Sequence, residues 1–270
     1  MLEGRLAPLD EPLLRRAYSA AEPFPSLMID GFLAPEFARE VVAALPSFEK
    51  ARSQGREFKA VNERGKVQVT QVEHFPPPIR ALHDVFASPH LLAALERITG
   101  ITGLLADDEL VGGGIHVMAP GAHLDVHVDF NCIAERSIYR RLNALLFLNE
   151  TWDPAWGGEL ELWDEHVARR HHAFTPRQNR LVLFETSERS FHGVRKVTSP
   201  PGASRRSFAV YYYTREAAPG QVGSHDTLFR ARPDERFKGR VLMPAERAWS
   251  NAREELRRIA RVAKRSLRRR

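Results

Sequence analysis

Apolar residues in the first hundred positions recur at helical spacing. This pattern predicts a short helix carrying Leu13 and Leu14 and ending near Pro23, then a strand at 26–30 and a helix that begins around Pro35. Residues 50–66 are polar and are expected to form a loop. Two further helices are predicted after the prolines at 76–78, with Gly100 suited to cap the second.

From about residue 110 the pattern changes to short runs with strand character, separated by Gly, Pro, Asn and Ser. The runs are 115–118, 124–130, 143–149, 159–163, 181–185, 191–197 and 206–214. Such spacing favours an all-β sandwich or barrel over a parallel α/β sheet. The expected fold class is therefore α+β. Residues 1–109 are predicted to form a helical support region of the same domain, 110–216 a β core, and 217–270 a C-terminal extension.

Composition narrows the class of protein. The 270 residues are 43% hydrophobic, enough for a core, and lack both an eighteen-residue apolar run and a charged-then-apolar leader. We expect a soluble chain that is neither secreted nor membrane-spanning. The single cysteine, Cys132, fits a reducing compartment, here taken as the cytoplasm, and excludes a disulfide framework or a cysteine-built metal site within one chain. Any metal must therefore be held by His and carboxylate.

The net charge of +6 comes from the end of the chain. Residues 251–270 carry nine Lys/Arg and two Glu, so the rest of the chain is close to neutral and gives no charge-based reason to expect nucleic-acid binding. Trp249, Leu256 and Ile259 recur at helical spacing among the arginines, which predicts a basic amphipathic helix. Docking of this helix on the body is favoured over contact with anionic lipid, RNA or an acidic partner.

The stretch 123–130 carries the chemistry. Polar and apolar residues alternate there without a break, so period-two geometry places His123, Asp125, His127 and Asp129 on one face of a strand. Four ionisable side chains on one face are costly unless they meet water or a metal. A His and an Asp two residues apart can ligate one ion from the same side.

His192 is the best candidate for a third ligand, because it is a lone His at the start of a β-branched run. Two His and one carboxylate leave open positions on an ion, an arrangement typical of non-haem Fe(II) oxygenases. Spacing by itself is weak, since any HxD followed by a later His fits it. The earlier pair His123 and Asp125 remains an alternative.

Further motifs follow in a recognisable order. They are Met118-Ala119-Pro120-Gly121, His127-Val128-Asp129, Leu146-Phe147-Leu148-Asn149, Trp156-Gly157-Gly158-Glu159-Leu160, His192-Gly193-Val194 and 206–213. Over residues 110–216 the chain resembles the prolyl-4-hydroxylase-like branch of the 2-oxoglutarate/Fe(II) dioxygenases. The resemblance implies a double-stranded β-helix, or jelly roll, with Fe(II) held by His127, Asp129 and His192.

The resemblance also implies the cosubstrates and the reaction. An Arg or Lys after the distal His binds the far carboxylate of 2-oxoglutarate in that family, and the matching residue is taken to be Arg206, which can hold a carboxylate bidentately. Arg206 shares strand parity with Phe208 and Val210, whereas Arg205 is expected to point to the opposite face. Asn143 is a further candidate cosubstrate contact. O2 is consumed, succinate and CO2 are co-products, and ascorbate is an additional reductant to test.

Other residues are open to more than one interpretation. His116 either lines the pocket or packs in the core, and His171 and His172 are expected on a solvated loop. The tryptophans at 152, 156 and 163 are packing residues or part of a substrate wall. Three more candidate contacts near the ligand strand are Asn131, Tyr139 and Arg141.

The favoured function is hydroxylation of an unactivated C–H bond in a small molecule or a peptidyl or prolyl substrate, with the small molecule preferred. A cupin-like metal enzyme that does not use 2-oxoglutarate is one alternative, and a non-catalytic barrel that only binds is another. The sequence leaves the substrate, the hydroxylated position and the oligomeric state open.

Overall fold

The computed structural model describes residues 4–221, 223–235 and 237–244. Its helices are α1 (Glu11–Ser19), α2 (Pro35–Ala43), α3 (Phe48–Gln54), α4 (Pro77–Phe86) and α5 (Pro89–Thr99). The predicted helices are confirmed as α1, α2, α4 and α5. In α5, the Ser88 side chain accepts a hydrogen bond from the Leu91 amide, and Gly100 ends the helix at φ 77°.

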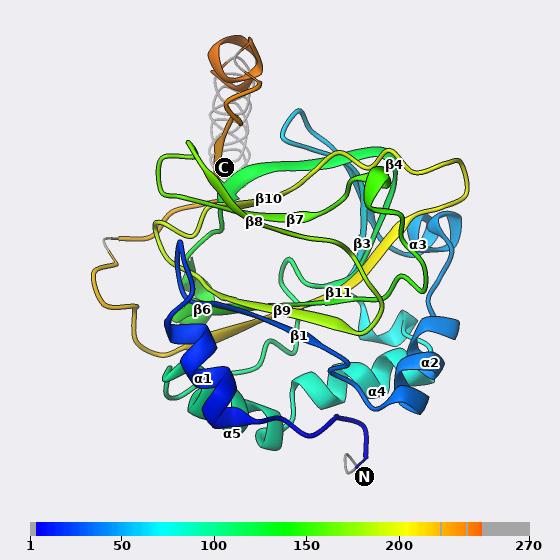
Figure 1. Cartoon of the computed structure of the whole chain (residues 1–270), viewed down its shortest axis with the longest axis vertical. Coiled ribbons are helices and arrows are strands. Elements are labelled where there is room, and N and C mark those ends of the chain that lie inside the picture. The colour runs from blue at the N-terminus through cyan, green and yellow to red at the C-terminus, as the bar shows by residue number, and fades with distance from the viewer. Residues whose placement is uncertain (1–3, 222, 236, 245–270) are drawn as a thin grey trace, which may run out of the picture.

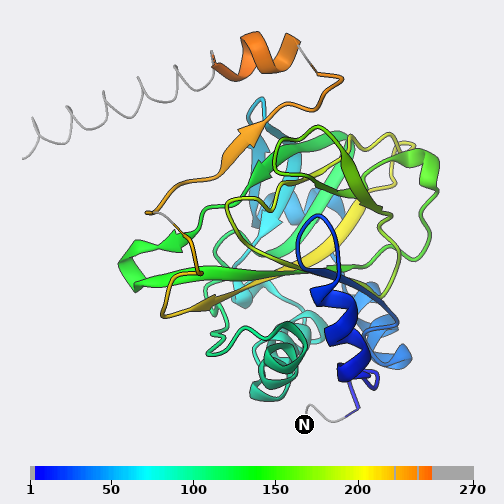
Figure 2. The same cartoon turned by 60° about the vertical axis from the view of Figure 1, so that its left-hand side comes forward.

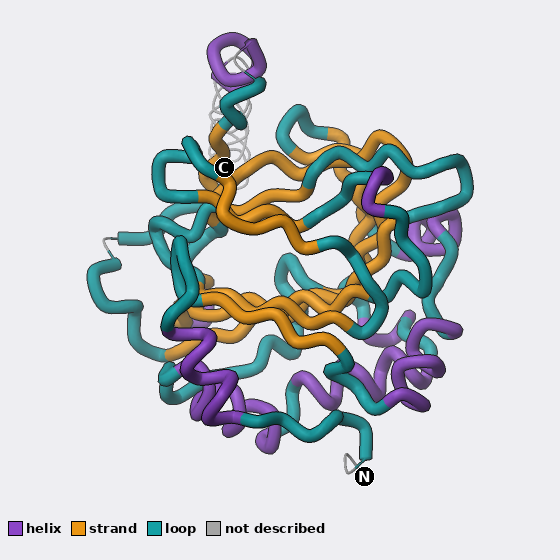
Figure 3. The backbone as a smooth tube through the Cα atoms, in the orientation of Figure 1, coloured by secondary structure: helices purple, strands orange, loops and turns teal. Residues whose placement is uncertain are grey.

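Within the described residues, twelve strands form one curled antiparallel sheet. They are β1 (Ser26–Asp30), β2 (Arg56–Lys59), β3 (Glu63–Val69), β4 (Gly114–Val128), β5 (Cys132–Ile133), β6 (Ile138–Phe147), β7 (Leu160–Trp163), β8 (Arg170–Phe174), β9 (Arg180–Glu185), β10 (His192–Val194), β11 (Arg205–Thr214) and β12 (Leu228–Arg230). The main order is β1-β9-β6-β11-β4-β10-β7-β8. Figure 3 shows two layers of strands facing each other, which is the jelly-roll core of an α+β fold, as the sequence predicted.

Strand β4 belongs to both layers. Its first half pairs with β11, where Met118 lies opposite Arg205, and its second half pairs with β10, where His127 lies opposite His192. Between the two β4–β10 pairs, Leu124 to His127 spans three residues while Val194 to His192 spans two, which is a β-bulge. The bulge changes the alternation of side chains just before the candidate ligands.

The helices cover the outer face of one layer. The largest core cluster joins side chains of α2, α4 and α5 to those of β6, β9 and β11, with Phe208 and Tyr212 at its sheet side. Figure 1 and Figure 2 show α1, α2, α4 and α5 gathered on one side of the strands and the segment that ends at residue 244 on the opposite side, and Figure 1 shows α3 beside β3. The even-numbered side chains of β11 therefore face the helices, and the odd-numbered ones face the space between the layers.

Two loop predictions are wrong. Residues 50–66 contain most of α3, all of β2 and the start of β3, and His171 and His172 lie on β8. Both segments are polar because one face of each strand meets solvent, and short half-exposed strands give little apolar signal. The predicted helix over 251–270 lies outside the described residues. Within the described chain, no helix has the length and apolar character needed to cross a bilayer.

Candidate metal centre and cosubstrate pocket

Three of the predicted residues form a cluster between the two layers. His127 is on β4, Asp129 follows the end of β4, and His192 begins β10. His127 Nε2 lies 3.4 Å from Asp129 Oδ1, and His192 Nε2 lies 3.3 Å from Asp129 Oδ2. All three ligand atoms fall within 4.8 Å of one another, so a single ion can reach each of them.

Both histidines are oriented by the backbone. The Nδ1 atom of His127 lies 2.8 Å from the carbonyl oxygen of Asp125, and the Nδ1 atom of His192 lies 2.9 Å from that of Ser190. A carbonyl oxygen can only accept, so each Nδ1 carries the proton and each Nε2 presents a lone pair toward the cluster. Burial, together with neighbouring His127, lowers the pKa of His192 and favours this neutral form.

The carboxylate of Asp129 is held ionised by its neighbours. Burial alone would raise its pKa, but the Arg140 guanidinium holds the pKa of Asp129 well below its usual range. Arg140 Nη2 lies 2.9 Å from Oδ2, and Asn143 Nδ2 donates to the same oxygen over 2.8 Å. One ionised carboxylate and two imidazole lone pairs suit Fe(II) and similar divalent ions.

The alternative pair His123 and Asp125 lies on the other side of the strand. The bulge in β4 turns the Asp125 side chain outward, where Lys238 Nζ donates to its Oδ1 over 2.6 Å. The expectation that four ionisable residues share one face is wrong for these two. Among the described residues, the only group placed to hold a metal is His127, Asp129 and His192.

Arg206 does not reach the cluster. It lies on the even-numbered face of β11 and lines a separate surface pocket with Trp152 and Trp156. Arg205 instead lines the cavity that contains His127 and His192. The prediction that the two arginines point to opposite faces of the strand is correct. The prediction that Arg206 is the one facing the cavity is wrong, because the apolar residues on the same face as Arg206 pack against the helices rather than inside the jelly roll.

Arg205 has an unused donor. It is 1% exposed, its Nε donates to the Gly158 carbonyl over 2.7 Å, and Nη1 donates to Ser207 over 3.3 Å. Nη2 is buried and has no hydrogen-bond partner. Burial lowers the pKa of Arg205 to about 10, so the side chain stays charged at neutral pH. A buried guanidinium with a free donor fits a ligand carboxylate.

The cavity between the layers has a volume of about 250 Å³ and holds both groups. The predicted residues Asn143 and His116 line it, and Trp152, Trp156 and Trp163 are not among its lining residues in the described chain. Other polar lining side chains are Glu63, Lys66, Gln68, Arg140, Tyr211 and Thr227. Lys66 is ion-paired with Glu63 in this lining, whereas Arg205 has a donor without a partner, which favours a ligand that presents a carboxylate to Arg205.

Sequence reasoning missed Arg140. Strict alternation from Asn143 puts Arg141, not Arg140, on the cavity side. In the pairing with β11, Tyr212 lies opposite Leu142 but Tyr213 lies opposite Arg140, so Arg141 is a bulge residue. The bulge brings Arg140 to Asp129, where it also lies 3.4 Å from the centre of the Tyr211 ring. Its proximity in sequence to Asn143 was the available signal.

Part of this chain is similar to known proteins. Residues 113–213 match the sequence profile of the 2OG-Fe(II) oxygenase superfamily. A segment of 78 residues is 38% identical to the prolyl 3-hydroxylase OGFOD1 of Mus musculus, covering 27% of this chain and 14% of that protein. The chain thus spans about a seventh of the length of this curated relative.

Solved structures show the same fold. A Trichoplax adhaerens prolyl hydroxylase, in complex with a hypoxia inducible factor oxygen degradation domain peptide fragment, matches with a TM-score of 0.53 at 20% identity over 75% of this chain and 90% of that one. HygX from Streptomyces hygroscopicus, with nickel, 2-oxoglutarate and hygromycin B bound, matches with a TM-score of 0.50 at 13% identity over 83% and 98%. The profile match over residues 113–213, the jelly-roll fold and the His-Asp-His cluster together make the β core of this chain similar to the 2OG-Fe(II) oxygenase superfamily.

Proposed function

We propose that this chain is a hydroxylase in which His127, Asp129 and His192 hold Fe(II) and Arg205 binds the far carboxylate of 2-oxoglutarate. The observation that carries the proposal is that one cavity is lined both by the His-Asp-His cluster and by a buried arginine with a free donor. When bound, Fe(II) and 2-oxoglutarate supply the oxidation of a C–H bond by O2, with succinate and CO2 as co-products.

The residues of the chain position the reactants. Arg140 and Asn143 fix the Asp129 carboxylate, and the two backbone carbonyls fix the histidine rings. Arg205, which donates a hydrogen bond to Ser207, orients the cosubstrate from the far end. Apolar side chains such as Leu145, Leu160 and Phe229 exclude water from the space between them.

The substrate is proposed to be a small polar molecule, with a peptidyl proline as the competing class. The cavity is about 250 Å³ and is shared with the cosubstrate, which limits the space for a second ligand. A peptide can present a single ring to such a space, so the prolyl class stays in the screen. We also propose a cytoplasmic location, supported by the single half-buried cysteine, Cys132.

Anaerobic titration of the metal-free chain with Fe(II) and 2-oxoglutarate tests the function. A visible charge-transfer band is expected in wild type, lost in His192→Ala and retained in His123→Ala, which removes the outward-facing histidine. Succinate release then screens prolyl peptides, amino acids and sugars, with and without ascorbate. Folded, metal-loaded wild type without the band would favour a metal enzyme that does not use 2-oxoglutarate, and a chain that binds neither would favour a non-catalytic barrel.

A further inference from the structure

The segment after the jelly roll returns to the strand that carries two of the candidate ligands. Strand β12 pairs antiparallel with β4, and Phe229 lies directly opposite His127. The centres of these two rings are 5.3 Å apart, and Phe229 lines the cavity together with Thr227. We call residues 225–235 the strap. Its first half borders the cavity, and its second half crosses the outer face of the same layer.

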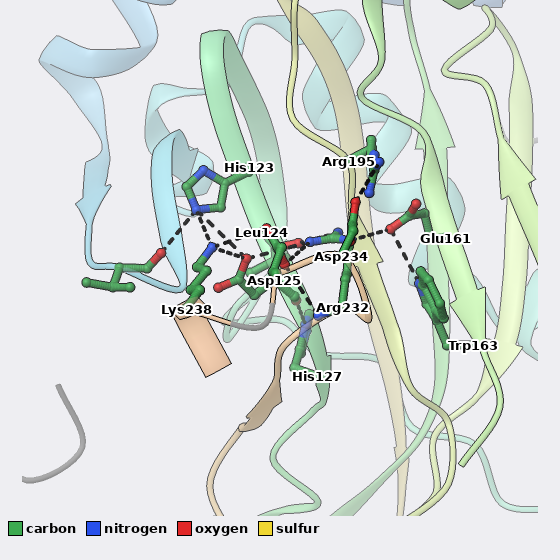
Figure 4. Close-up of polar contacts among 12 residues, drawn as sticks. His123, Leu124, Asp125, His127, Glu161, Trp163, Arg195, Arg232, Asp234 and Lys238 are labelled. Atoms are coloured by element: carbon green, nitrogen blue, oxygen red, sulfur yellow. Dashed lines mark hydrogen bonds and ion pairs between the residues drawn. The ribbon is translucent and has the colours of Figure 1, made fainter. Parts of the chain in front are cut away.

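Arg232 is the centre of that second half. It is 3% exposed and lies between two carboxylates that are fully buried, Asp125 and Glu161. Its Nε donates to Glu161 Oε2 over 2.7 Å, and its Nη1 lies 3.6 Å from Asp125 Oδ1. Figure 4 shows the guanidinium between these side chains, with Lys238 on the far side of Asp125 and Trp163 beside Glu161.

The network touches the backbone that orients His127 and lies beside the residue that follows His192. The carbonyl of Asp125 accepts the hydrogen bond from His127 Nδ1. On the next strands, Gly193 follows His192 directly and lies opposite Glu161 of β7. Arg232 Nη2 also donates to the Leu124 carbonyl over 3.3 Å. The Arg232 side chain thus links β4 to β7 across β10. It does so on the outer face of the sheet, opposite to the face from which the ligand side chains project.

Gly193 makes room for this contact. A Cβ atom at that position would lie 3.1 Å from Arg232 Nη2 and 3.0 Å from the Leu124 carbonyl oxygen. Any larger residue would therefore press on the guanidinium or on β4. The glycine after the second histidine lets Arg232 lie flat against β10.

We propose that Arg232 is a positioning residue for the metal centre, which fixes the β4 and β10 strands, and with them His127 and His192, from the outer face of the sheet. This inference rests on the proposed function, because it assumes that the cluster holds a metal. Interactions beyond the ligands typically change metal affinity by about 10- to 100-fold when they are removed. The strap is then part of the metal centre, although it lies outside the predicted β core.

Titration of the metal-free full-length chain with Co(II) tests this, using both the dissociation constant and the visible absorption spectrum of bound Co(II). Arg232→Gln is expected to weaken Co(II) binding about 10- to 100-fold and to shift the spectrum, because the ligand geometry changes. Arg232→Lys is expected to rescue part of the loss, since it keeps one ion pair. The matched control is Arg230→Ala on the same strap, whose guanidinium lies over the Phe191 ring, away from both carboxylates.

A double variant separates positioning from folding. Removing one member of a buried ion pair is strongly destabilising, whereas replacing both members by apolar residues is often tolerated. Arg232→Met with Glu161→Met removes the Arg232–Glu161 pair as a unit while Lys238 still pairs with Asp125, and the same weakening and spectral shift are expected. Unchanged affinity and spectrum in these folded variants would overturn the inference alone. Wild type that binds no Co(II) would overturn the metal centre as well.

Discussion

Arg205 and Arg206 are consecutive residues of β11 whose side chains lie on opposite faces of the sheet. Arg205 pairs across the strands with Met118 and enters the cavity, whereas Arg206 pairs with Val117 and lies beside Trp152 in the surface pocket. Two cations one residue apart therefore line different pockets. Of these two arginines, Arg205 is the one that shares a cavity with the His-Asp-His cluster.

Replacing each arginine in turn by methionine tests which of the two binds 2-oxoglutarate. Arg205→Met is expected to weaken 2-oxoglutarate binding about 10- to 100-fold, because a hydrogen bond to a charged group is worth about 1.5–3 kcal/mol. Arg206→Met is the matched control and is expected to bind normally. Isothermal titration of the metal-loaded chain gives both constants, and the reverse order of effects would return the cosubstrate role to Arg206.

Arg140 is expected to control the pH at which metal binds. Its guanidinium holds the pKa of Asp129 well below the ordinary value, so the carboxylate stays ionised into acid. In Arg140→Gln the pKa of Asp129 rises and protons compete with the metal at higher pH. Co(II) binding is therefore lost at a higher pH on acidification than in wild type, so the acid limb of its pH profile moves to higher pH. Arg141→Gln, one residue away on the bulge, serves as the control and should leave the limb in place.

Metal should stabilise the folded chain. Because the cluster exists only when β4 and β10 are paired, an ion at 100 times its dissociation constant adds about 2.7 kcal/mol to the free energy of unfolding. Thermal denaturation with and without Ni(II) measures the shift. Asp129→Asn should remove most of it, and an equal shift in that variant would mean that the stabilising ion binds elsewhere.

The contact between helices and sheet should dominate stability. Phe208 is fully buried, and its ring centre lies 6.0 Å from that of Phe75 and 5.9 Å from that of Phe86. Phe208→Ala is expected to lower the free energy of unfolding by about 3–5 kcal/mol through lost burial and a cavity. Leu13→Ala, at a position 52% exposed, should change it by less than about 0.5 kcal/mol. Urea denaturation of the two variants compares them directly.

The sequence pattern predicted an element correctly where that element depends on neighbouring residues alone. The strand at 26–30 and the cap at Gly100 were both predicted, because alternation and left-handed caps depend on neighbouring residues. The polar strands β2, β3 and β8 were missed. Their membership in the sheet depends on partners far away in sequence, such as β4 for β3, rather than on their own apolar content.

The sequence by itself determined the class of fold and a short set of candidate ligands, two HxD pairs and His192, because the two-residue spacing within each pair puts both members on one face of a regular strand. Only the tertiary structure decided which arginine enters the cavity, which of the two HxD pairs faces inward, and that Arg140 and Arg232 belong to the site. The bulge in β4 turns His127 and Asp129 inward, and the bulge in β6 turns Arg140 inward. Packing against the helix layer determines which side chains of β11 face outward. A bulge reverses every later side chain, and its position depends on long-range strand pairing that no local pattern records.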